Sequence, residues 1–292
     1  MRMNNRQRRH MTTFALIGDG AIAKYHKAAV EHVGGEIVMV FDPKYEDTSL
    51  CRDLFSDHGV SYETEFAPSI FKGIIGGPVD YFIICSPSNL HRKHILQILE
   101  FYPSAQIICE KPYKLPWETS LPELEHDLAR INIAMQLNWA KELEWIETAS
   151  SIHVDMVRDD DYLKSYKGDP KITGGFVTNL FIHYIHLAYK WKCGFEGKVS
   201  TSGIQERGVW DGSAWESDGT LKAHCSYTSF DHIDYQTAYN RMYDDIMIGK
   251  GMKIKDLEFV HWVTSDLSLY SKATAGGIVQ IPDSIWHGSV FV

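Results

Sequence analysis

Lys111 stands in a sequence context that suits a residue at a reaction centre. It follows the short apolar run Ala105-Gln-Ile-Ile-Cys109, which predicts a buried strand, and it precedes Pro112, whose ring restricts the backbone. A lysine held at the end of a buried strand can donate a hydrogen bond to a reacting hydroxyl and stabilise the negative charge that develops there. The alternative is a solvent-exposed surface lysine.

The segment from Gly174 to His186 supplies a candidate proton acceptor. It predicts a helix in which Asn179 and His183 share a face and His183 and His186 are neighbours. One histidine suits the role of general base in an alcohol oxidation, because its ordinary pKa lies near working pH. The His183/His186 pair lacks a carboxylate at metal-ligand spacing, so we expect no metal site. The alternative for His183 is a hydrogen-bonded core residue.

A glycine-rich turn near the start of the chain predicts a dinucleotide site. The apolar run Phe14–Ile17 leads into Gly18-x-Gly20-x-x-Ala23 and then into a segment that favours helix. Gly18 permits the tight turn, Gly20 leaves room for a pyrophosphate, and Ala23 lets the helix pack close to the strand. The N–H groups at the start of the helix and its dipole then attract the phosphates.

Asp42 closes the next predicted strand, Glu36 to Asp42, at about the 20-residue spacing expected for the acid that binds the ribose. Its carboxylate would accept hydrogen bonds from the ribose hydroxyls and repel a 2′-phosphate, which favours NAD over NADP. An ordinary turn at Asp42-Pro43 is the alternative. We favour the cofactor site.

Strands and helices alternate from Thr13 to about Met135, which predicts an α/β fold with a doubly wound parallel sheet of the Rossmann type. Ligands of such sheets bind beyond the carboxyl ends of the strands. Four candidate residues, from four different strand ends, meet this rule: Gly18, Asp42, Ser86 and Lys111.

The pattern changes after Trp139. Strand candidates at 152–157, 199–205, 222–229 and 277–281, with helices at 179–191 and 232–248, predict a C-terminal α+β domain built on a mostly antiparallel open sheet. The predicted organisation is a disordered tail at 1–12, a dinucleotide-binding domain at 13–138, and a substrate-binding and oligomerisation domain at 139–292.

Composition excludes several classes of protein. The chain has 292 residues and a net charge of −9, which argues against a nucleic-acid surface, and it contains no apolar run long enough to span a bilayer. The basic start, Met1 to His10, is not followed by the apolar region of a secretion signal. Five scattered cysteines without a C-x-x-C pair predict neither disulfides nor zinc, and favour a reducing cytoplasm.

A polar loop precedes the helix that carries His183. It runs from Tyr162 to Pro170 and includes Lys164, Ser165 and Lys167, which could together hold a carboxylate or a diphosphate. The alternative is a solvated turn.

Four motifs together resemble the glucose–fructose oxidoreductase/inositol dehydrogenase (Gfo/Idh/MocA) family over nearly the whole chain. The motifs are Gly18-x-Gly20-x-x-Ala23, Cys85-Ser-Pro-x-x-Leu-His91, Glu110-Lys111-Pro112 and the Gly-Gly-led helix that bears His183. The loop from Tyr162 to Pro170, Thr178-Asn179-x-x-x-His183 and Tyr243-x-Asp245-Ile-x-x-Gly249-x-Gly251 resemble a narrower branch, the UDP-N-acetylglucosaminuronic acid 3-dehydrogenases of bacterial surface-polysaccharide synthesis.

The resemblance implies specific roles. Lys111 and His183 would be the catalytic pair at the sugar C3 hydroxyl, and NAD would be recycled in the active site with 2-oxoglutarate as a candidate hydride acceptor. Residues at the cofactor would be Gly18, Gly20, Ala23, Asp42, Ser86, Asn89, His91, Glu110 and Gln136. Residues on the substrate side would be Lys164, Ser165, Lys167 and Asn179. Relatives commonly form dimers or tetramers, so we expect a homo-oligomer.

Two other functions stay open at this point. One is a dehydrogenase of the same family that acts on a free sugar or a cyclitol. The other is a non-catalytic NAD-binding sensor, against which the presence of both Lys111 and His183 argues, because a sensor needs neither.

Overall fold

The computed structural model describes most of the chain. The residues described are 11–46, 61–63, 79–119, 121, 125–148, 151–158, 160–175, 177–200, 214–217, 220–227, 233–258, 260–261, 264 and 278–281. The expected tail lies outside these residues, except for its last two positions.

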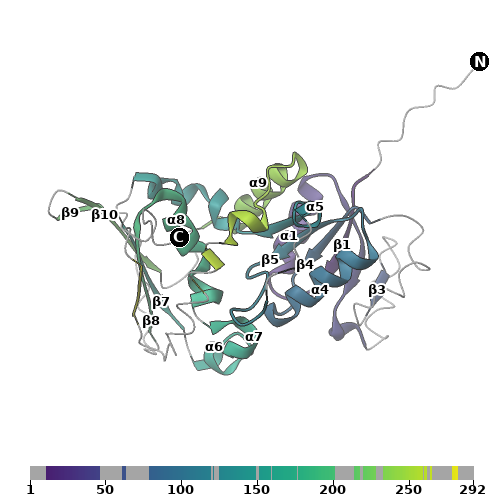
Figure 1. Cartoon of the computed structure of the whole chain (residues 1–292), viewed down its shortest axis with the longest axis horizontal. Coiled ribbons are helices and arrows are strands. Elements are labelled where there is room, and N and C mark those ends of the chain that lie inside the picture. Colours follow the sequence, from purple (N-terminus) through teal and green to yellow (C-terminus); the bar gives the residue numbers. More distant parts are fainter. Residues whose placement is uncertain are drawn as a thin grey trace, which may run out of the picture.

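A six-stranded parallel sheet forms the first half of the molecule (Figure 1), with the strand order β3-β2-β1-β4-β5-β6. The strands are β1 (Thr13–Ile17), β2 (Glu36–Phe41), β3 (Ser61–Glu63), β4 (Tyr81–Ile84), β5 (Gln106–Glu110) and β6 (Ile131–Ala134). This is the order of a dinucleotide-binding sheet, so the predicted Rossmann fold is confirmed. Its switch point, where the order reverses, lies between β1 and β4.

Helices cover both faces of this sheet because the apolar side chains of each strand alternate between the faces. On one face, Phe14 and Leu16 pack with helix α1 (Ala23–His32) and with helix α9 (Tyr235–Met247). On the other face, Ala15 and Ile17 share a core with helix α4 (Ser88–Phe101). A short helix, α5 (Glu125–Leu128), precedes β6, and a 3-10 turn, η1 (Pro43–Glu46), follows β2.

A five-stranded sheet forms the second half, in the order β11-β8-β7-β10-β9. Its strands are β7 (Ser151–Val157), β8 (Gly194–Ser200), β9 (Ala214–Ser217), β10 (Thr220–Tyr227) and β11 (Ile278–Ile281). The expectation of a mostly antiparallel sheet needs correction, because β7 runs parallel to both β8 and β10, and only the two outer pairings are antiparallel. Parallel neighbours need a long crossover, and the helices between β7 and β8 supply one.

The remaining helical segments are short. They are η2 (Gln136–Trp139), η3 (Lys141–Thr148), α6 (Asp160–Lys164), α7 (Pro170–Thr173), the π-helix η4 (Val177–Phe181), α8 (Ile182–Trp191) and η5 (Ile254–Asp256). The expected helix at 179–191 therefore begins as a π-helix, a form often found at functional sites. Among these segments α8 packs on β7 and β8 of the second sheet, whereas η5 lies against β6 of the first.

Helix α9 follows strands β7 to β10 of the second sheet and returns to the first sheet (Figure 1). Its Tyr239, Met242 and Tyr243 are buried in one cluster with Ala29 and Val30 of α1. The expected division at 138/139 stays a prediction, and a segment from the C-terminal side of that division completes the core of the first sheet.

Candidate functional site

A cavity of about 680 Å³ lies where the carboxyl ends of β4 and β5 meet residues 158–184 and the start of α9. Eight of the residues proposed from the sequence line it: Ser86, His91, Glu110, Lys111, Gln136, Lys167, Asn179 and His183. A cavity of this size suits a small-molecule ligand and lies where α/β sheets bind theirs.

The glycine-rich turn adopts the geometry that its sequence predicts. Gly18 has φ of +90°, and its N–H donates to the Phe41 carbonyl at 2.7 Å. A Cβ at Gly18 would lie 2.6 Å from the Ser86 nitrogen, so only glycine fits this crossing of two strand ends. Gly20 is exposed, with no atom within 4 Å of the place where its Cβ would be. Ala23 is fully buried as the first residue of α1.

Asp42 organises this turn from the end of β2. Its Oδ2 accepts from the Asp19 N–H at 2.6 Å, and its Oδ1 accepts from the Lys44 N–H at 3.0 Å. The Asp19 carboxylate in turn accepts from Lys27 at 2.7 Å and from Lys44 at 2.8 Å. Burial raises the pKa of Asp19, but its hydrogen bonds with Lys27, Lys44 and Tyr45 outweigh this and lower it overall. Asp42 thus lies beside the glycine turn, where a ribose-binding carboxylate is needed.

Lys111 is tied to the segment that carries His183. Its Nζ donates to the backbone carbonyl of Asn179 and, at 3.4 Å, to the Oδ1 of the same residue. Asn179 Nδ2 donates to the hydroxyl of Tyr162 at 3.1 Å, which also lines the cavity. Burial lowers the pKa of Lys111 to about 8; the Glu110 carboxylate opposes this shift, while Arg158 and Lys167 add to it.

His183 lies in the same cavity, in the first turn of α8. It is 5% exposed, and its Nδ1 has no hydrogen-bond partner among the described residues. Burial, Lys111 and His186 together keep the pKa of His183 well below its ordinary value, so the imidazole is neutral at neutral pH. His186 is equally buried but does not line the cavity.

The environment of Gln136 indicates that these residues fit a nicotinamide cofactor. It is 4% exposed, it lines the cavity, and its Oε1 has no hydrogen-bond partner in the described part of the chain. A buried acceptor without a donor is costly unless a ligand supplies one. Together with the open space at Gly20 and the carboxylate at Asp42, it fits a dinucleotide.

The Ser86–His91 segment has a structural part in the cavity. His91 Nδ1 lies 2.6 Å from the Pro112 carbonyl, and its Nε2 lies 2.7 Å from the Ser86 carbonyl. His91 therefore connects the loops after β4 and β5. Asn89, one of the residues proposed at the cofactor, is exposed in the first turn of α4 and does not line the cavity.

The predicted substrate loop contributes one of its three candidates to the cavity. Lys167 lines it, whereas Lys164 is exposed and lies outside the lining. The Ser165 hydroxyl donates to the Tyr162 carbonyl at 2.7 Å and accepts from the Lys167 N–H at 3.2 Å. It thus shapes the turn that presents Lys167.

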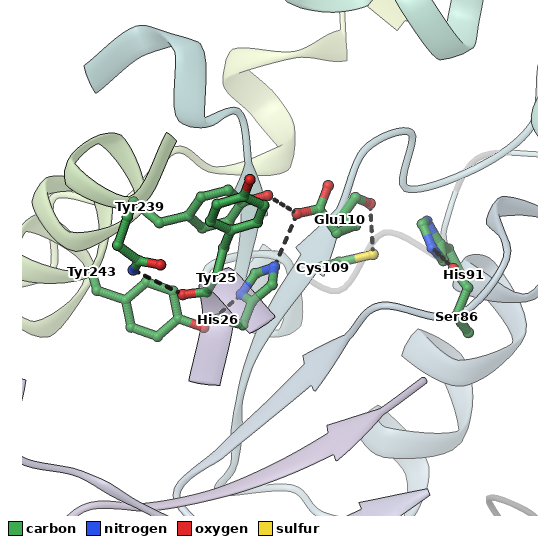
Figure 2. A network of polar contacts seen from close by, with 9 residues as sticks. Tyr25, His26, Ser86, His91, Cys109, Glu110, Tyr239 and Tyr243 are labelled. Atoms are coloured by element: carbon green, nitrogen blue, oxygen red, sulfur yellow. Dashed lines mark hydrogen bonds and ion pairs between the residues drawn. The ribbon is translucent and has the colours of Figure 1, made fainter. Parts of the chain in front are cut away.

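Sequence reasoning missed two groups of residues at this site. Arg158 and Tyr162 line the cavity, with the guanidinium 5.1 Å from the Tyr162 ring centroid. Arg158 comes directly after β7, so the strand-end rule that singled out Lys111 could have found it. The second group is a buried polar network around Glu110 (Figure 2), whose members come from β5, α1 and α9.

The described residues contain no group of three or more His, Cys, Asp or Glu residues arranged to hold a metal ion. None of their helices is both long enough and apolar enough to cross a membrane.

Comparison with known proteins agrees with this geometry. Residues 12–124 match the model of the GFO_IDH_MocA oxidoreductase family, NAD-binding Rossmann fold. The chain is therefore an NAD-dependent oxidoreductase. Its first sheet and the helices around it resemble the NAD-binding domain of the Gfo/Idh/MocA family.

Solved structures share the fold of both halves. The WlbA (WbpB) dehydrogenase from Thermus thermophilus, in complex with NAD and UDP-GlcNAcA, is 21% identical with a TM-score of 0.60, covering 88% of this chain and 95% of that one. The same enzyme with NAD and α-ketoglutarate gives a TM-score of 0.65 at 21% identity, covering 91% and 96%. A myo-inositol dehydrogenase from Corynebacterium glutamicum is 14% identical with a TM-score of 0.56, covering 93% and 99%.

Proposed function

We propose that this protein oxidises the C3 hydroxyl of a UDP-N-acetyl-hexuronic acid, of the UDP-N-acetylglucosaminuronic acid type, with NAD. The observation that carries this proposal is the set of cations in the cavity wall: Lys111, Arg158 and Lys167 line it, together with the carboxylates of Glu110 and Asp234. A carboxylate and a diphosphate on the substrate would both be stabilised by such cations. The likeness to the WlbA fold supports the same choice.

Cofactor and substrate are held by different residues in this proposal. Gly18, Gly20 and Asp42 would hold the adenosine half of NAD, and Glu110 and Gln136 would lie at the nicotinamide half. When bound, NAD supplies the acceptor for the hydride that leaves C3. Lys167 and Asn179, with the Ser165 turn behind them, would hold the substrate.

Lys111 and His183 would divide the work on the hydroxyl. His183, neutral at neutral pH, accepts the hydroxyl proton as general base. The Lys111 ammonium donates a hydrogen bond to the same oxygen and stabilises the charge that develops on it. Lys111 would exchange its present contact with Asn179 for the substrate oxygen, while Asn179 stays anchored by Tyr162.

We also propose 2-oxoglutarate as the compound that reoxidises the cofactor, and a place in polysaccharide biosynthesis in the cytoplasm. A second candidate function is a cyclitol dehydrogenase, because a myo-inositol dehydrogenase shares the fold. An uncharged cyclitol, however, gives no partner to the charges of Arg158 and Lys167.

Thermal unfolding in the presence of NAD tests the substrate class. UDP should raise the unfolding temperature and myo-inositol should leave it unchanged. Lys167→Ala should reduce the effect of UDP, whereas Lys171→Ala should not, because Lys171 is exposed on α7 and does not line the cavity. Stabilisation by myo-inositol without any by UDP would reverse the assignment, and NAD binding without hydride exchange to any sugar would favour a sensor.

A further inference from the structure

A buried polar network joins α1, the end of β5 and α9 (Figure 2). His26 of α1 is fully buried, with its Nε2 2.9 Å from Glu110 Oε1 and its Nδ1 2.7 Å from the Tyr243 hydroxyl. The hydroxyl of Tyr239 donates to the same Glu110 oxygen at 2.5 Å. The partners of Glu110 lie 84 and 129 residues away in the sequence.

The direction of these hydrogen bonds follows from the carboxylate. Burial raises the pKa of Glu110, but its hydrogen bond and electrostatic interaction with His26, the hydrogen bond from Tyr239 and the charge of Lys111 outweigh this and lower it overall. An ionised carboxylate only accepts, so His26 Nε2 donates to it. His26 Nδ1 lies within hydrogen-bond distance of the Tyr243 hydroxyl, so both ring nitrogens have a partner.

Glu110 acts directly on its neighbour Lys111. The Glu110 charge raises the pKa of Lys111, against burial and against the repulsion from Arg158 and Lys167. Were Glu110 to lose its donors in this buried place, it would take up a proton more readily, and Lys111 would lose the charge that keeps it protonated. The protonation state of Lys111 is thereby linked to His26 and Tyr239, whose hydrogen bonds are with Glu110.

We propose that His26 and Tyr239 are positioning residues for Lys111, which hold the Glu110 carboxylate ionised and oriented beside the lysine. Because Tyr239 belongs to α9, the charge state of Lys111 depends on the docking of α9 against α1. The inference rests on the proposed function only for the catalytic role of Lys111. The dependence of the Lys111 charge on His26 and Tyr239 is a property of the protein without any sugar.

Several other groups face this pair and must be considered in its titration. Around Glu110 they are His91 and Cys85 of the β4 side, Cys109 of β5, and Tyr243 of α9. Around Lys111 they are Arg158, Lys167 and His183. The variants below leave these groups in place.

Lysine NMR measures the linkage directly. Reductive methylation with ¹³C-formaldehyde labels the lysines of the full chain, and the signal that is missing in Lys111→Arg identifies Lys111. In the wild-type protein this signal should titrate near the pKa of about 8. In Glu110→Gln the titration should move down by about one unit, as expected for loss of a nearby opposite charge, and in His26→Leu and Tyr239→Phe, which each remove one donor to Glu110, it should move down by a smaller amount.

Matched variants separate this linkage from general damage. Tyr81→Phe removes a hydroxyl from the same aromatic cluster, at the opposite end of the β4–β5 pair, and should leave the Lys111 titration unchanged. His26→Gln keeps an amide N–H that can donate to Glu110 and should stay close to wild type. In the Glu110→Gln background, His26→Leu should cause no further shift, because its effect passes through Glu110.

The titration of Lys111 in these variants decides whether His26 and Tyr239 position Glu110. A lower Lys111 titration in Tyr239→Phe and His26→Leu, absent in Tyr81→Phe and not additive with Glu110→Gln, supports the proposal. An unchanged titration in folded Tyr239→Phe overturns it, and so does a shift of equal size in Tyr81→Phe. If His26→Leu does not fold, Tyr239→Phe and His26→Gln still decide, since each retains the bulk of the native side chain.

Discussion

The Lys111 ammonium donates to the backbone carbonyl of Asn179, which places the end of β5 directly against the π-helix that leads to His183. This contact joins the first sheet to the segment that leads to His183, at the point where both candidate catalytic residues line one cavity. An amine whose pKa is lowered and an imidazole that stays neutral are thereby brought to the same space.

The pH dependence of sugar oxidation should reflect Lys111 on its alkaline side. The lysine is required as a protonated hydrogen-bond donor, and its pKa is about 8, so the rate should fall as pH rises through that value. Since the pKa of His183 lies well below its ordinary value, protonation of His183 should cause no loss of rate as the pH falls from 8 to 6.5. Initial rates of NADH formation from pH 5 to 10 check this, and a rate that keeps rising above pH 9 would contradict the role of the ammonium.

His183→Gln should lower the oxidation rate by about 100-fold or more, the usual contribution of a general base. His186→Gln is the matched control, because His186 is on the same helix, is also 5% exposed, and does not line the cavity. Both variants should lose stability, but His186→Gln should keep most of its rate. NAD affinity, measured by fluorescence titration, should be similar in both; equal rates in the two variants would remove His183 from the mechanism.

Gly18 and Gly20 should respond differently to alanine. Gly18→Ala places a Cβ 2.6 Å from the Ser86 nitrogen at φ of +90°, so it should destabilise the fold as well as weaken NAD binding. Gly20→Ala meets no atom within 4 Å, so its thermal stability should stay near wild type. Its Cβ should nevertheless reduce NAD affinity by entering the space of the pyrophosphate. Unfolding and NAD titrations of both variants test this contrast.

Acid should destabilise the fold through buried histidines. Burial lowers the pKa of His94 and of His186 to about 4, and that of His261 to about 3. The unfolded chain takes up these protons below about pH 6.5 while the folded protein does not, so stability should fall as pH falls from 6.5 towards 4. Each such histidine adds at most about 1.4 kcal/mol per pH unit to the slope. The free energy of unfolding of His261→Phe, measured in urea at several pH values, should depend less steeply on pH than that of the wild type. An identical dependence on pH would contradict the assignment.

The sequence predicted the features that rest on local patterns. The turn at Gly18, the carboxylate at Asp42 and the lysine at Lys111 each follow a strand, and parallel strands bring their carboxyl ends to one edge of the sheet. The structure places Lys111 and His183 in one cavity, although their separation in the chain is large. Their catalytic roles stay predictions.

Features that depend on contacts between distant segments were beyond the sequence. The parallel pairings of β7 are set by which strands become neighbours, and polar alternation within a strand does not reveal that. His26 is a single polar residue on the buried face of α1, which has no meaning until Tyr243, 217 residues away, lies beside it. Lys164 and Lys167 look equivalent in the loop, and only the folded turn shows that Lys167 reaches the cavity.

The most direct test of the central claim is an absorbance spectrum at 340 nm of the purified protein with NAD, before and after stoichiometric UDP-N-acetylglucosaminuronic acid. The proposed oxidation predicts a new band of reduced nicotinamide, which disappears again when 2-oxoglutarate is added. The absence of any band, with NAD shown by extraction to be bound and oxidised, would contradict oxidation of this substrate.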